Sequence, residues 1–374
     1  MNDQAWMARA LQLAELGLYS THPNPRVGCV IVKDGQLVGS GWHQLAGQPH
    51  AEVHALREAG VQVRGATAYV TLEPCSHHGR TGPCAAALVQ AGVGRVVVAM
   101  PDPNPQVAGR GLELLHNAGI GVQVLEGELQ QQARELNRGF VKRMQQGLPW
   151  VTAKLAMSLD GRTAMASGES QWITGPAARA DVQLLRARSS VVISGADTVI
   201  HDDARLNVRA ELLRLPEEQK ELALRRQPLR LVVDSRGRVP VDSAFYRAGP
   251  ALVASHVQPD GLPPRAAWLQ VAANGGRVDL ADLLRQLAQQ HQANEVLVEA
   301  GPQLAGAFLR AGLLDELVIY MAGKLMGSSA RPLFELPLAQ MADSIELQIR
   351  QVRAVGCDWR MDCRIPDDMT PGRG

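Results

Sequence analysis

The chain has 374 residues, 46% hydrophobic and 20% charged, which is ordinary for a globular protein but too long for one ordinary core. Lysine and arginine (38) nearly balance aspartate and glutamate (37), so the molecule as a whole has no field that would attract nucleic acid or an anionic membrane. Residues 1–16 lack the features of a signal peptide, and no segment approaches the roughly 20 apolar residues of a membrane span. Five cysteines, an odd number, argue against a disulfide framework. We therefore expect a two-domain cytoplasmic protein without a nucleic-acid or membrane partner; its oligomeric state, a homo-oligomer included, stays open.

The first part of the chain alternates helix and strand signals. Apolar residues at helical spacing predict a helix over residues 3–18, and the apolar run at 27–32 before the Asp34-Gly35 turn predicts a strand. The other predicted elements are a helix over 50–59 before Gly60, a strand over 66–72, a helix over 83–91 before Gly92 and a strand over 95–100. Strands separated by helices of this length predict a sheet covered by helices.

A polar stretch at 143–149 separates this region from a second alternating pattern, so we expect domains over residues 1–146 and 147–374. A charged stretch at 209–227 predicts a surface helix or an insertion. The second domain is predicted to contain strands over 150–157, 190–194, 229–234, 295–299 and 315–321, and helices over 176–187, 279–291 and 303–311.

One set of histidine, cysteine and glutamate residues in the first domain has the pattern of a catalytic metal site. His50 and Glu52 open a predicted helix, Cys75 follows a strand, and Cys84 lies nine positions later at the start of the next helix. One imidazole and two thiolates suit tetrahedral Zn²⁺ and leave the fourth position for water, whose pKa the metal lowers to about 7. Glu52 is not a ligand, and it can take the water proton and pass it to a departing amine. The sequence therefore predicts a zinc-dependent deaminase.

The spacing follows the zinc-deaminase signature, H-x-E followed by P-C-x-x-C, with one departure. Eight residues rather than two separate Cys75 from Cys84. A single histidine or cysteine usually packs in a core, which is how we interpret Cys29, while Cys357 and Cys363 are expected to be structural. Three zinc-type ligands together with a glutamate are hard to explain that way.

Motifs along nearly the whole chain resemble the bifunctional deaminase/reductase family of riboflavin biosynthesis, and the eight-residue spacing belongs to that pattern. The motifs are HPNP at 22–25, HAE at 50–52, TLEPCSHHGRT at 71–81, Cys84, DPNP at 102–105, KLAMSLDG at 154–161, SQWIT at 170–174 and VEAGP at 298–302. The resemblance implies a cytidine-deaminase-like α/β/α domain followed by a dihydrofolate-reductase-like α/β domain.

The family also implies a substrate, a diaminopyrimidinone that carries a ribosylamino 5-phosphate. The first domain would hydrolyse its 2-amino group to give a uracil and ammonia, and the second would use NADPH to reduce the ribosyl group to a ribityl group. By resemblance, the pyrimidine and its phosphate-bearing arm are held by Asn24, His43, His77 and Arg80.

In the second domain, a predicted strand runs into a glycine-bearing turn and a helix N-terminus, which offers free amides to a phosphate. Alone this signal is weak, and it is not the G-x-G-x-x-G fingerprint of standard dinucleotide-binding folds. The resemblance assigns the NADPH pyrophosphate to this turn, at Gly301, Pro302, Gln303, Leu304, Ala305, Gly306 and Ala307.

Charged residues suggest where a phosphorylated sugar binds. Lys154 lies inside an apolar strand, which is costly unless its ammonium has a partner, and Glu299 ends a strand where it can face a cleft. Either of Arg186 and Arg209 could bind the phosphate or lie on the surface. The resemblance adds Ser170 and Leu206 to the substrate site. It places Ala156, Trp172, Thr198 and Asp202 at the cofactor, the last two in a loop, and Ser235 with Arg236 near the adenosine 2′-phosphate.

Two other interpretations compete. A nucleoside or tRNA deaminase could be fused to an unrelated binding domain, but the near-neutral charge and the long Cys75–Cys84 loop count against it. The ligand set could instead hold a structural zinc in a non-catalytic protein. Structural sites usually have a fourth protein ligand, and Glu52 would then have no task.

Overall fold

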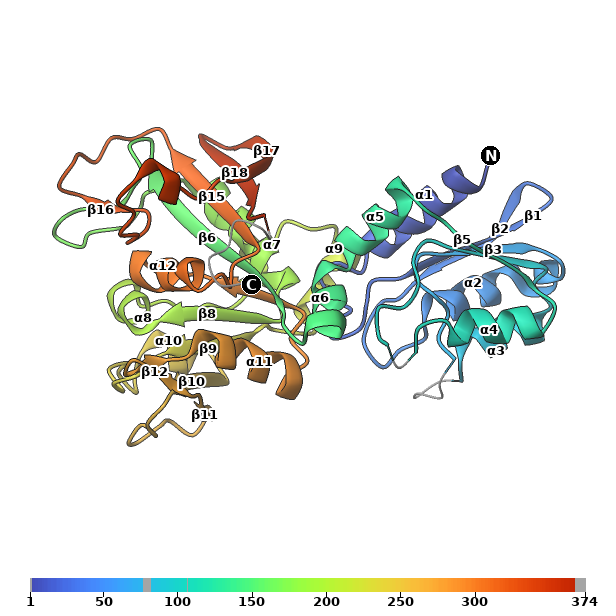
Figure 1. Cartoon of the computed structure of the whole chain (residues 1–374), viewed down its shortest axis with the longest axis horizontal. Helices are drawn as coiled ribbons and strands as arrows, with labels where there is room; N and C mark the ends of the chain where they lie inside the picture. The colour runs from blue at the N-terminus through green and yellow to red at the C-terminus, as the bar shows by residue number, and fades with distance from the viewer. Residues whose placement is uncertain (1, 77–81, 106, 367–374) are drawn as a thin grey trace. The chain divides into compact units, whose positions relative to one another are not determined.

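The computed structural model describes residues 2–76, 82–105 and 107–366. Two compact units make up the fold (Figure 1): the N-terminal unit, Met1–Gly147 with Glu221–Arg225, and the C-terminal unit, Leu148–Lys220 with Arg226–Gly374. No helix among the described residues is both long and apolar enough to cross a membrane.

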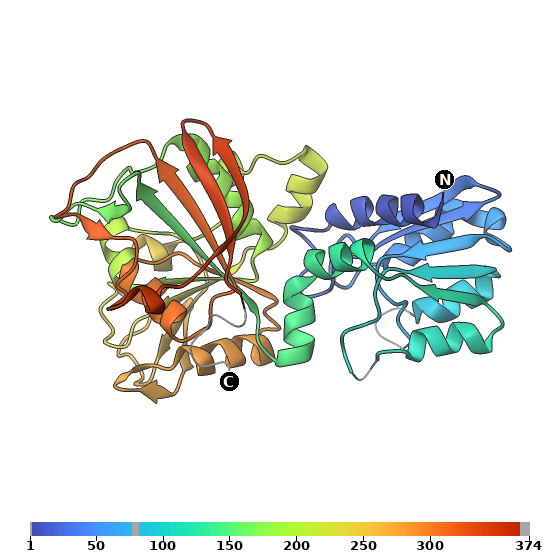
Figure 2. The ribbon, with the colours of Figure 1, turned by 45° about the horizontal axis from the view of Figure 1, so that its top comes forward.

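The N-terminal unit is a five-stranded mixed sheet between two layers of helices. The sheet order is β2-β1-β3-β4-β5; β1 is antiparallel to both neighbours, whereas β3, β4 and β5 are parallel. Helices α1 and α5 cover one face, and α2, α3 and α4 cover the other (Figures 1 and 2). The elements are α1 (Asp3–Glu15), β1 (Gly28–Lys33), β2 (Gln36–Trp42), α2 (Ala51–Ala59), β3 (Thr67–Val70), α3 (Cys84–Ala91), β4 (Arg95–Val98), α4 (Arg110–Asn117), β5 (Gly121–Val124), α5 (Glu128–Leu136) and α6 (Arg138–Gln146).

Close backbone packing fixes the start of α2 against the sheet. A Cβ atom at Gly41 of β2 would lie 2.5 Å from the Ala51 carbonyl oxygen, far inside contact distance. Only glycine allows α2 to lie this close to the strand. The N-terminus of α2, which carries His50 and Glu52, is thereby held at a fixed height over the sheet.

All six elements predicted in this unit are present, but the sequence argument missed others. It missed β2, which pairs with β1 across the Asp34-Gly35 turn, and everything between β4 and Gly147. Residues 143–146, interpreted as a polar linker, are the last turn of α6, which ends at Gly147 with φ +68°. A surface helix with a narrow apolar face carries the same polar composition as a linker.

The C-terminal unit is built on a nine-stranded sheet of order β11-β10-β9-β8-β14-β6-β15-β18-β17. Strands from β11 to β15 run parallel, and the β17–β18 hairpin adds an antiparallel edge. The sheet strands are β6 (Trp150–Ser158), β8 (Val191–Gly195), β9 (Leu229–Val233), β10 (Ala251–Ser255), β11 (Ala266–Gln270), β14 (Glu295–Val298), β15 (Glu316–Ala322), β17 (Gln348–Val355) and β18 (Asp358–Arg364).

Helices cover this sheet on both faces. One apolar cluster joins the sheet to α11 and α12, and two clusters on the other face join it to α7, α8 and α10. The helices are α7 (Pro176–Arg188), α8 (Ala196–Asp202), α9 (Glu217–Leu224), α10 (Ala244–Arg247), α11 (Leu280–Gln290) and α12 (Pro302–Arg310); the short strands outside the main sheet are β7 (Arg162–Ala164), β12 (Ala273–Asn274), β13 (Arg277–Val278) and β16 (Arg331–Pro332).

Adjacent strands β8 and β14 are followed by α8 and α12, which lie on opposite faces of the sheet. A crevice forms outside the carboxyl ends of parallel strands where successive connections leave in opposite directions, and ligands bind there. The predicted strands and helices of this unit are all present, with α9 inside the charged stretch 209–227. The sequence argument missed α8, α10, β10, β11 and the β17–β18 hairpin.

Candidate functional site

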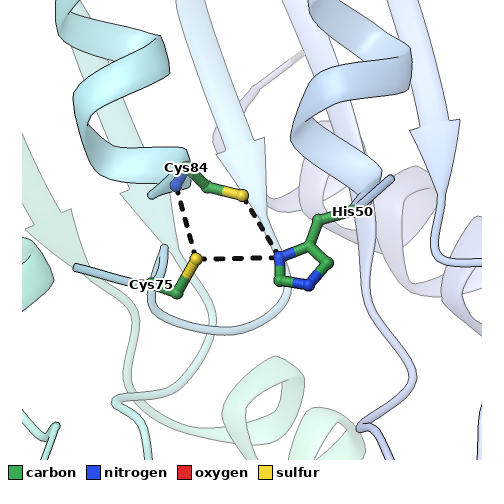
Figure 3. A group of neighbouring side chains, drawn as sticks. All are labelled: His50, Cys75 and Cys84. Atoms are coloured by element: carbon green, nitrogen blue, oxygen red, sulfur yellow. Dashed lines mark hydrogen bonds between the residues drawn. The ribbon is translucent and has the colours of Figure 1, made fainter. Parts of the chain in front are cut away.

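The three predicted zinc ligands lie side by side in the N-terminal unit (Figure 3). His50 is the N-cap residue of α2, Cys84 is the first residue of α3, and Cys75 lies in the segment after β3. The His50 Nδ1 atom is 3.3 Å from Cys84 Sγ and 3.7 Å from Cys75 Sγ. The main-chain N–H of Cys84 donates a hydrogen bond to Cys75 Sγ, 3.3 Å away.

This arrangement fits a zinc ion. Bond lengths of about 2.3 Å to sulfur and about 2.0 Å to nitrogen, at a tetrahedral angle, place the two ligand atoms about 3.5 Å apart. The observed separations of 3.3 and 3.7 Å bracket that value. Hydrogen bonds from Cys84 and His50 lower the pKa of Cys75, which therefore holds a thiolate ready for a cation.

Glu52 is the second residue of α2, lies beside the three ligands and is 3% exposed. Its Oε2 atom is buried without a hydrogen-bond partner in the described part of the chain. Burial raises the pKa of Glu52 to about 7, although the charge of His50 acts in the opposite direction. An unpartnered buried carboxylate oxygen is costly and points to a ligand that is bound in the working protein.

Asn24 and His43 form a connected pair next to this cluster. His43 is buried, and burial lowers its pKa to about 4, so the ring is neutral at pH 7. Its Nδ1 lies 3.1 Å from the Pro49 carbonyl and must donate, which leaves Nε2 to accept from the Asn24 amide nitrogen at 3.0 Å. Both nitrogens of His43 are thus engaged, whereas Asn24 keeps its Oδ1 for a ligand. His77 and Arg80 lie outside the described residues.

The sequence argument overlooked Glu73. This buried carboxylate accepts main-chain hydrogen bonds from Asp102, Gly109 and Gly111, at 2.9 to 3.1 Å. A Cβ atom at Gly111 would lie 2.0 Å from the Pro74 carbonyl oxygen, so the two segments pack as closely as glycine allows. The DPNP motif therefore supports the loop that carries Cys75. The position of this glutamate directly before Pro74-Cys75 was the one sequence feature that could have indicated its role.

In the C-terminal unit, Arg186 of α7 and Glu299 after β14 form a buried bidentate ion pair. The Nε–Oε1 distance is 2.6 Å and the Nη2–Oε2 distance is 2.9 Å, while Nη1 donates to the Asn207 carbonyl at 2.9 Å. Three of the five N–H groups of Arg186 are thus used within the protein. Lys154 lies half-buried in β6; burial lowers its pKa, and the charge of Glu299 opposes this.

Thr198 and Asp202, predicted to lie in a loop, belong to α8. Gly195 and Gly301 are the N-cap residues of α8 and α12; α8 begins directly after β8, and three residues separate the end of β14 from the start of α12. The Gly301 N–H donates to Thr198 Oγ1 at 3.2 Å and ties the two helix starts together. The loop prediction was wrong because seven residues are too few for a periodic pattern to show.

The first turn of α12 offers main-chain amides at Gln303 and Leu304, which have no intrahelical acceptor by geometry. Pro302 has no N–H, and the Ala305 N–H already donates to the Gly301 carbonyl at 3.2 Å. Ala305 and Gly306 are buried, and Ala307 is half-buried. Within the segment predicted to bind pyrophosphate, the free N–H groups of Gln303 and Leu304 are therefore the ones best placed to donate to a phosphate.

The C-terminal unit also contains a polar cavity of about 580 Å³, which is lined by Gln171, Trp172, Asp202, Asp203, Arg205, Asn207, Val208, Arg209, Ala210 and Glu211. Ser170 donates to Asp202 Oδ1 at 3.0 Å. Trp172 is 61% exposed, and the Arg179 guanidinium lies 4.4 Å from its ring centroid. Arg209 Nε is buried without a partner among the described residues.

Four other predicted site residues do not line the cavity. Leu206 is 2% exposed and has φ +57°, so only its main chain can meet a ligand. Ala156 lies in β6 two residues after Lys154, on the same face of the sheet. Ser235 and Arg236 follow β9, where Arg236 N donates to Asp234 Oδ1 at 3.4 Å.

One chain thus carries a zinc-ready histidine–cysteine cluster on an α/β/α unit and a polar crevice on an open α/β unit, which together define a deaminase joined to a reductase. The family described as "Cytidine and deoxycytidylate deaminase zinc-binding region" matches residues 1–100, and the family described as "RibD C-terminal domain" matches residues 149–361. Both predicted fold classes are confirmed.

Known proteins match over the whole length. The chain is 54% identical to riboflavin biosynthesis protein RibD of Escherichia coli, over 96% of this chain and 98% of the relative, and 50% identical to that of Haemophilus influenzae, over 96% of each. The solved structure of Acinetobacter baumannii RibD, form 1, superposes with a TM-score of 0.88 at 49% identity, covering 97% of this chain and 99% of that one. The chain belongs to the RibD family. It is a bifunctional deaminase and NADPH-dependent reductase of riboflavin biosynthesis that uses Zn²⁺, as the sequence predicted.

Proposed function

We propose that the N-terminal unit hydrolyses 2,5-diamino-6-(5-phosphoribosylamino)pyrimidin-4-one to 5-amino-6-(5-phosphoribosylamino)uracil and ammonia. His50, Cys75 and Cys84 are the zinc ligands, and Glu52 is the general acid and base. One observation carries the proposal: three ligand atoms lie within 4.8 Å of one another beside Glu52, whose Oε2 is buried and unpartnered in the described part of the chain.

Zinc, when bound, supplies a Lewis acid that makes water nucleophilic near neutral pH. Glu52 accepts a proton from the water as its oxygen bonds to C2 of the ring. Glu52 then gives the proton to the amino nitrogen as the carbon–nitrogen bond breaks. The second proton of the water ends on the ring nitrogen next to C2, ammonia leaves, and the oxygen of water becomes the new ring carbonyl, so the hydrolysis balances.

Asn24 orients the pyrimidine in this proposal. Because its amide nitrogen donates to His43, its Oδ1 is fixed in direction and can accept an N–H of the ring. His43 supports Asn24, since both of its own nitrogens are bonded within the protein. His77 and Arg80 complete the proposed substrate site on family resemblance.

In the C-terminal unit, the proposed reaction reduces the ribosyl group of the deaminated product to a ribityl group. NADPH, when bound, supplies the hydride. Lys154 and Glu299 hold the sugar hydroxyls. Arg209 binds the phosphate, helped by the remaining N–H groups of Arg186, by Ser170 and by the main chain of Leu206. This is supported by the buried, unpartnered Arg209 Nε beside the cavity.

The cofactor contacts follow from the same crevice. The amides of the first turn of α12 face a phosphate at a positive dipole end. The proposed NADPH contacts are Ala156, Trp172, Thr198, Asp202, Ser235, Gly301, Pro302, Gln303, Leu304, Ala305, Gly306 and Ala307. We also propose that the protein works in the cytoplasm on this small molecule, without a nucleic-acid or membrane partner; its five cysteines are all unpaired.

Product analysis by mass spectrometry tests the order of the two reactions. Without NADPH, the purified protein should convert the diaminopyrimidinone phosphate to the deaminated ribosyl compound and stop. With NADPH, the ribityl product should appear, two hydrogen atoms heavier. Cytidine serves as the control and should release no ammonia. Reduction of the 2-amino compound before deamination would contradict the proposed order.

A further inference from the structure

Residues 205–209 form one wall of the cavity in the C-terminal unit. Arg205, Asn207, Val208 and Arg209 line the cavity, whereas Leu206 is 2% exposed and belongs to an apolar core cluster. Leu206 has φ +57°, a left-handed conformation that is strained for a residue with a side chain. Such a conformation persists only where the surroundings hold it in place.

Side chains from other elements supply that restraint at nearly every peptide group of the segment. Two arginines donate to its carbonyls: Arg230 of β9 to Arg205 O at 3.0 Å, and Arg186 to Asn207 O at 2.9 Å. Two glutamines accept from its N–H groups: Gln227 from Val208 at 2.9 Å, and Gln183 from Arg209 at 2.9 Å.

The two glutamines form hydrogen bonds with consecutive peptide groups of the segment, at Val208 and Arg209. Gln183 lies on α7, is 3% exposed and also donates to the Arg179 carbonyl at 3.4 Å. Gln227 precedes β9 and returns a second bond to Val208, from Nε2 to the carbonyl at 3.3 Å. Together they fix the main chain immediately before and at Arg209, and hence the direction in which its side chain leaves.

We propose that Gln183 and Gln227 are positioning residues of the reductase site, which hold the 205–209 segment so that the Arg209 guanidinium meets the phosphate of the substrate. This rests on the proposed function, in which Arg209 binds that phosphate. Arg209 is half-buried and its Nε is fully buried, so the surrounding protein restricts the movement of the guanidinium. A misplacement of about 1 Å at such a contact can cost on the order of a hundredfold.

Matched substitutions separate the hydrogen bond from the shape of each side chain. Gln183→Met and Gln227→Met keep the length and remove the acceptor, whereas Gln183→Glu and Gln227→Glu keep an acceptor for the same N–H. Gln290→Met, on the exposed face of α11, is the control for a glutamine change elsewhere in the unit. The assay is NADPH oxidation with the purified deaminated intermediate, and ammonia release reports on the other unit of the same protein.

Each methionine variant should raise the KM for the intermediate about fivefold to tenfold, which matches the loss of one hydrogen bond of about 1–1.4 kcal/mol. The KM for NADPH and the rate of ammonia release should stay within twofold of wild type. The glutamate variants should restore the KM to within twofold. An unchanged KM for the intermediate in both methionine variants, or an equal rise in both KM values, would overturn the proposal.

Arg209→Met distinguishes this inference from the proposed function beneath it. The single substitution should raise the KM for the intermediate, and adding Gln183→Met to it should raise the KM no further, because Gln183 acts through Arg209. If Arg209→Met leaves the KM unchanged, the assignment of Arg209 is wrong. If it raises the KM but the glutamine effects add in full, Arg209 binds the phosphate and the positioning role is wrong. Should Gln183→Met fail to fold, Gln227→Met decides, because Gln227 lies at the surface.

Discussion

Glu299→Gln is the substitution whose effect the structure defines most fully. The carboxylate accepts two hydrogen bonds from Arg186, at 2.6 and 2.9 Å, and the two side chains are 9% and 11% exposed. Burial acts to raise the pKa of Glu299, but the charge and hydrogen bonds of Arg186, together with the charges of Lys154 and Arg209, outweigh it and lower the pKa, so the group is ionised at pH 7. Glutamine keeps the shape and one acceptor, and it turns an amide N–H₂ towards a guanidinium that can only donate.

The magnitude follows from these contacts. One of the two charge-assisted bonds is lost, and a hydrogen bond to a charged group is worth about 1.5–3 kcal/mol. Since about 1.4 kcal/mol corresponds to a factor of ten, kcat/KM for reduction should fall by roughly tenfold to a hundredfold. Ammonia release should be unchanged because the reaction belongs to the N-terminal unit.

The assay follows NADPH oxidation with the purified deaminated intermediate, and ammonia release in parallel. Glu346→Gln, at an exposed position of the same unit, is the matched control and should change neither rate. A Glu299→Gln variant that reduces the intermediate at the wild-type rate would refute the reasoning. Loss of ammonia release with reduction intact would show that Glu299 serves the other reaction.

Four further results are expected. Glu52→Gln should retain about one zinc per chain by metal analysis while deamination falls by about a hundredfold or more, because an amide cannot carry the proton. Lys154→Met should stop NADPH oxidation and spare ammonia release, since the ammonium that holds the sugar is lost; a loss of ammonia release alone would contradict its placement. Cleavage of the chain after Gly147 should leave units that each show folded circular dichroism, and two unfolded fragments would disprove this boundary. Asp181→Asn should lower the free energy of unfolding more at pH 7 than at pH 2. Burial acts to raise the pKa of Asp181, but hydrogen bonds from Tyr320, Arg353 and Arg360 outweigh it and lower the pKa, so its contribution is complete above about pH 4 and is lost as the pH falls through the lowered value. An equal loss at both pH values would show that the charge is not the cause.

The cluster in the N-terminal unit could be read from the sequence because its members lie at the ends of local elements. His50 caps α2, Cys84 opens α3, and both helices are signalled by glycines at their ends, Gly60 and Gly92. Helix boundaries and a short motif then suffice to bring the ligands together. The role of Glu73 was not predicted from the sequence, because its three hydrogen-bond partners lie 29 to 38 positions away along the chain.

The crevice of the C-terminal unit shows where such reasoning stops. The sequence suggested that Arg186 could bind a phosphate. In the structure its guanidinium donates to Glu299, which lies 113 positions away in the chain. Nothing in the local sequence of either residue signals that pairing, because it depends on which strands become neighbours in the sheet. Gln183 likewise lies in an ordinary helix, and only the course of the 205–209 segment gives it a task.

The balance of charge in each unit agrees with the ligand that we assign to it. Around His50 lie groups that bind a cation: the pKa of Cys75 is lowered so that it holds a thiolate, and Cys84 and Glu52 lie beside it. Around Glu299, the cations prevail, because Arg186, Lys154 and Arg209 all act on one carboxylate. Buried charge without compensation is expensive, so a site of the first kind needs a cation and one of the second kind needs an anion. A metal ion meets the first need and a phosphorylated sugar the second, which is why one chain can hold a zinc-dependent hydrolysis and a reduction of the phosphate-bearing product in separate units.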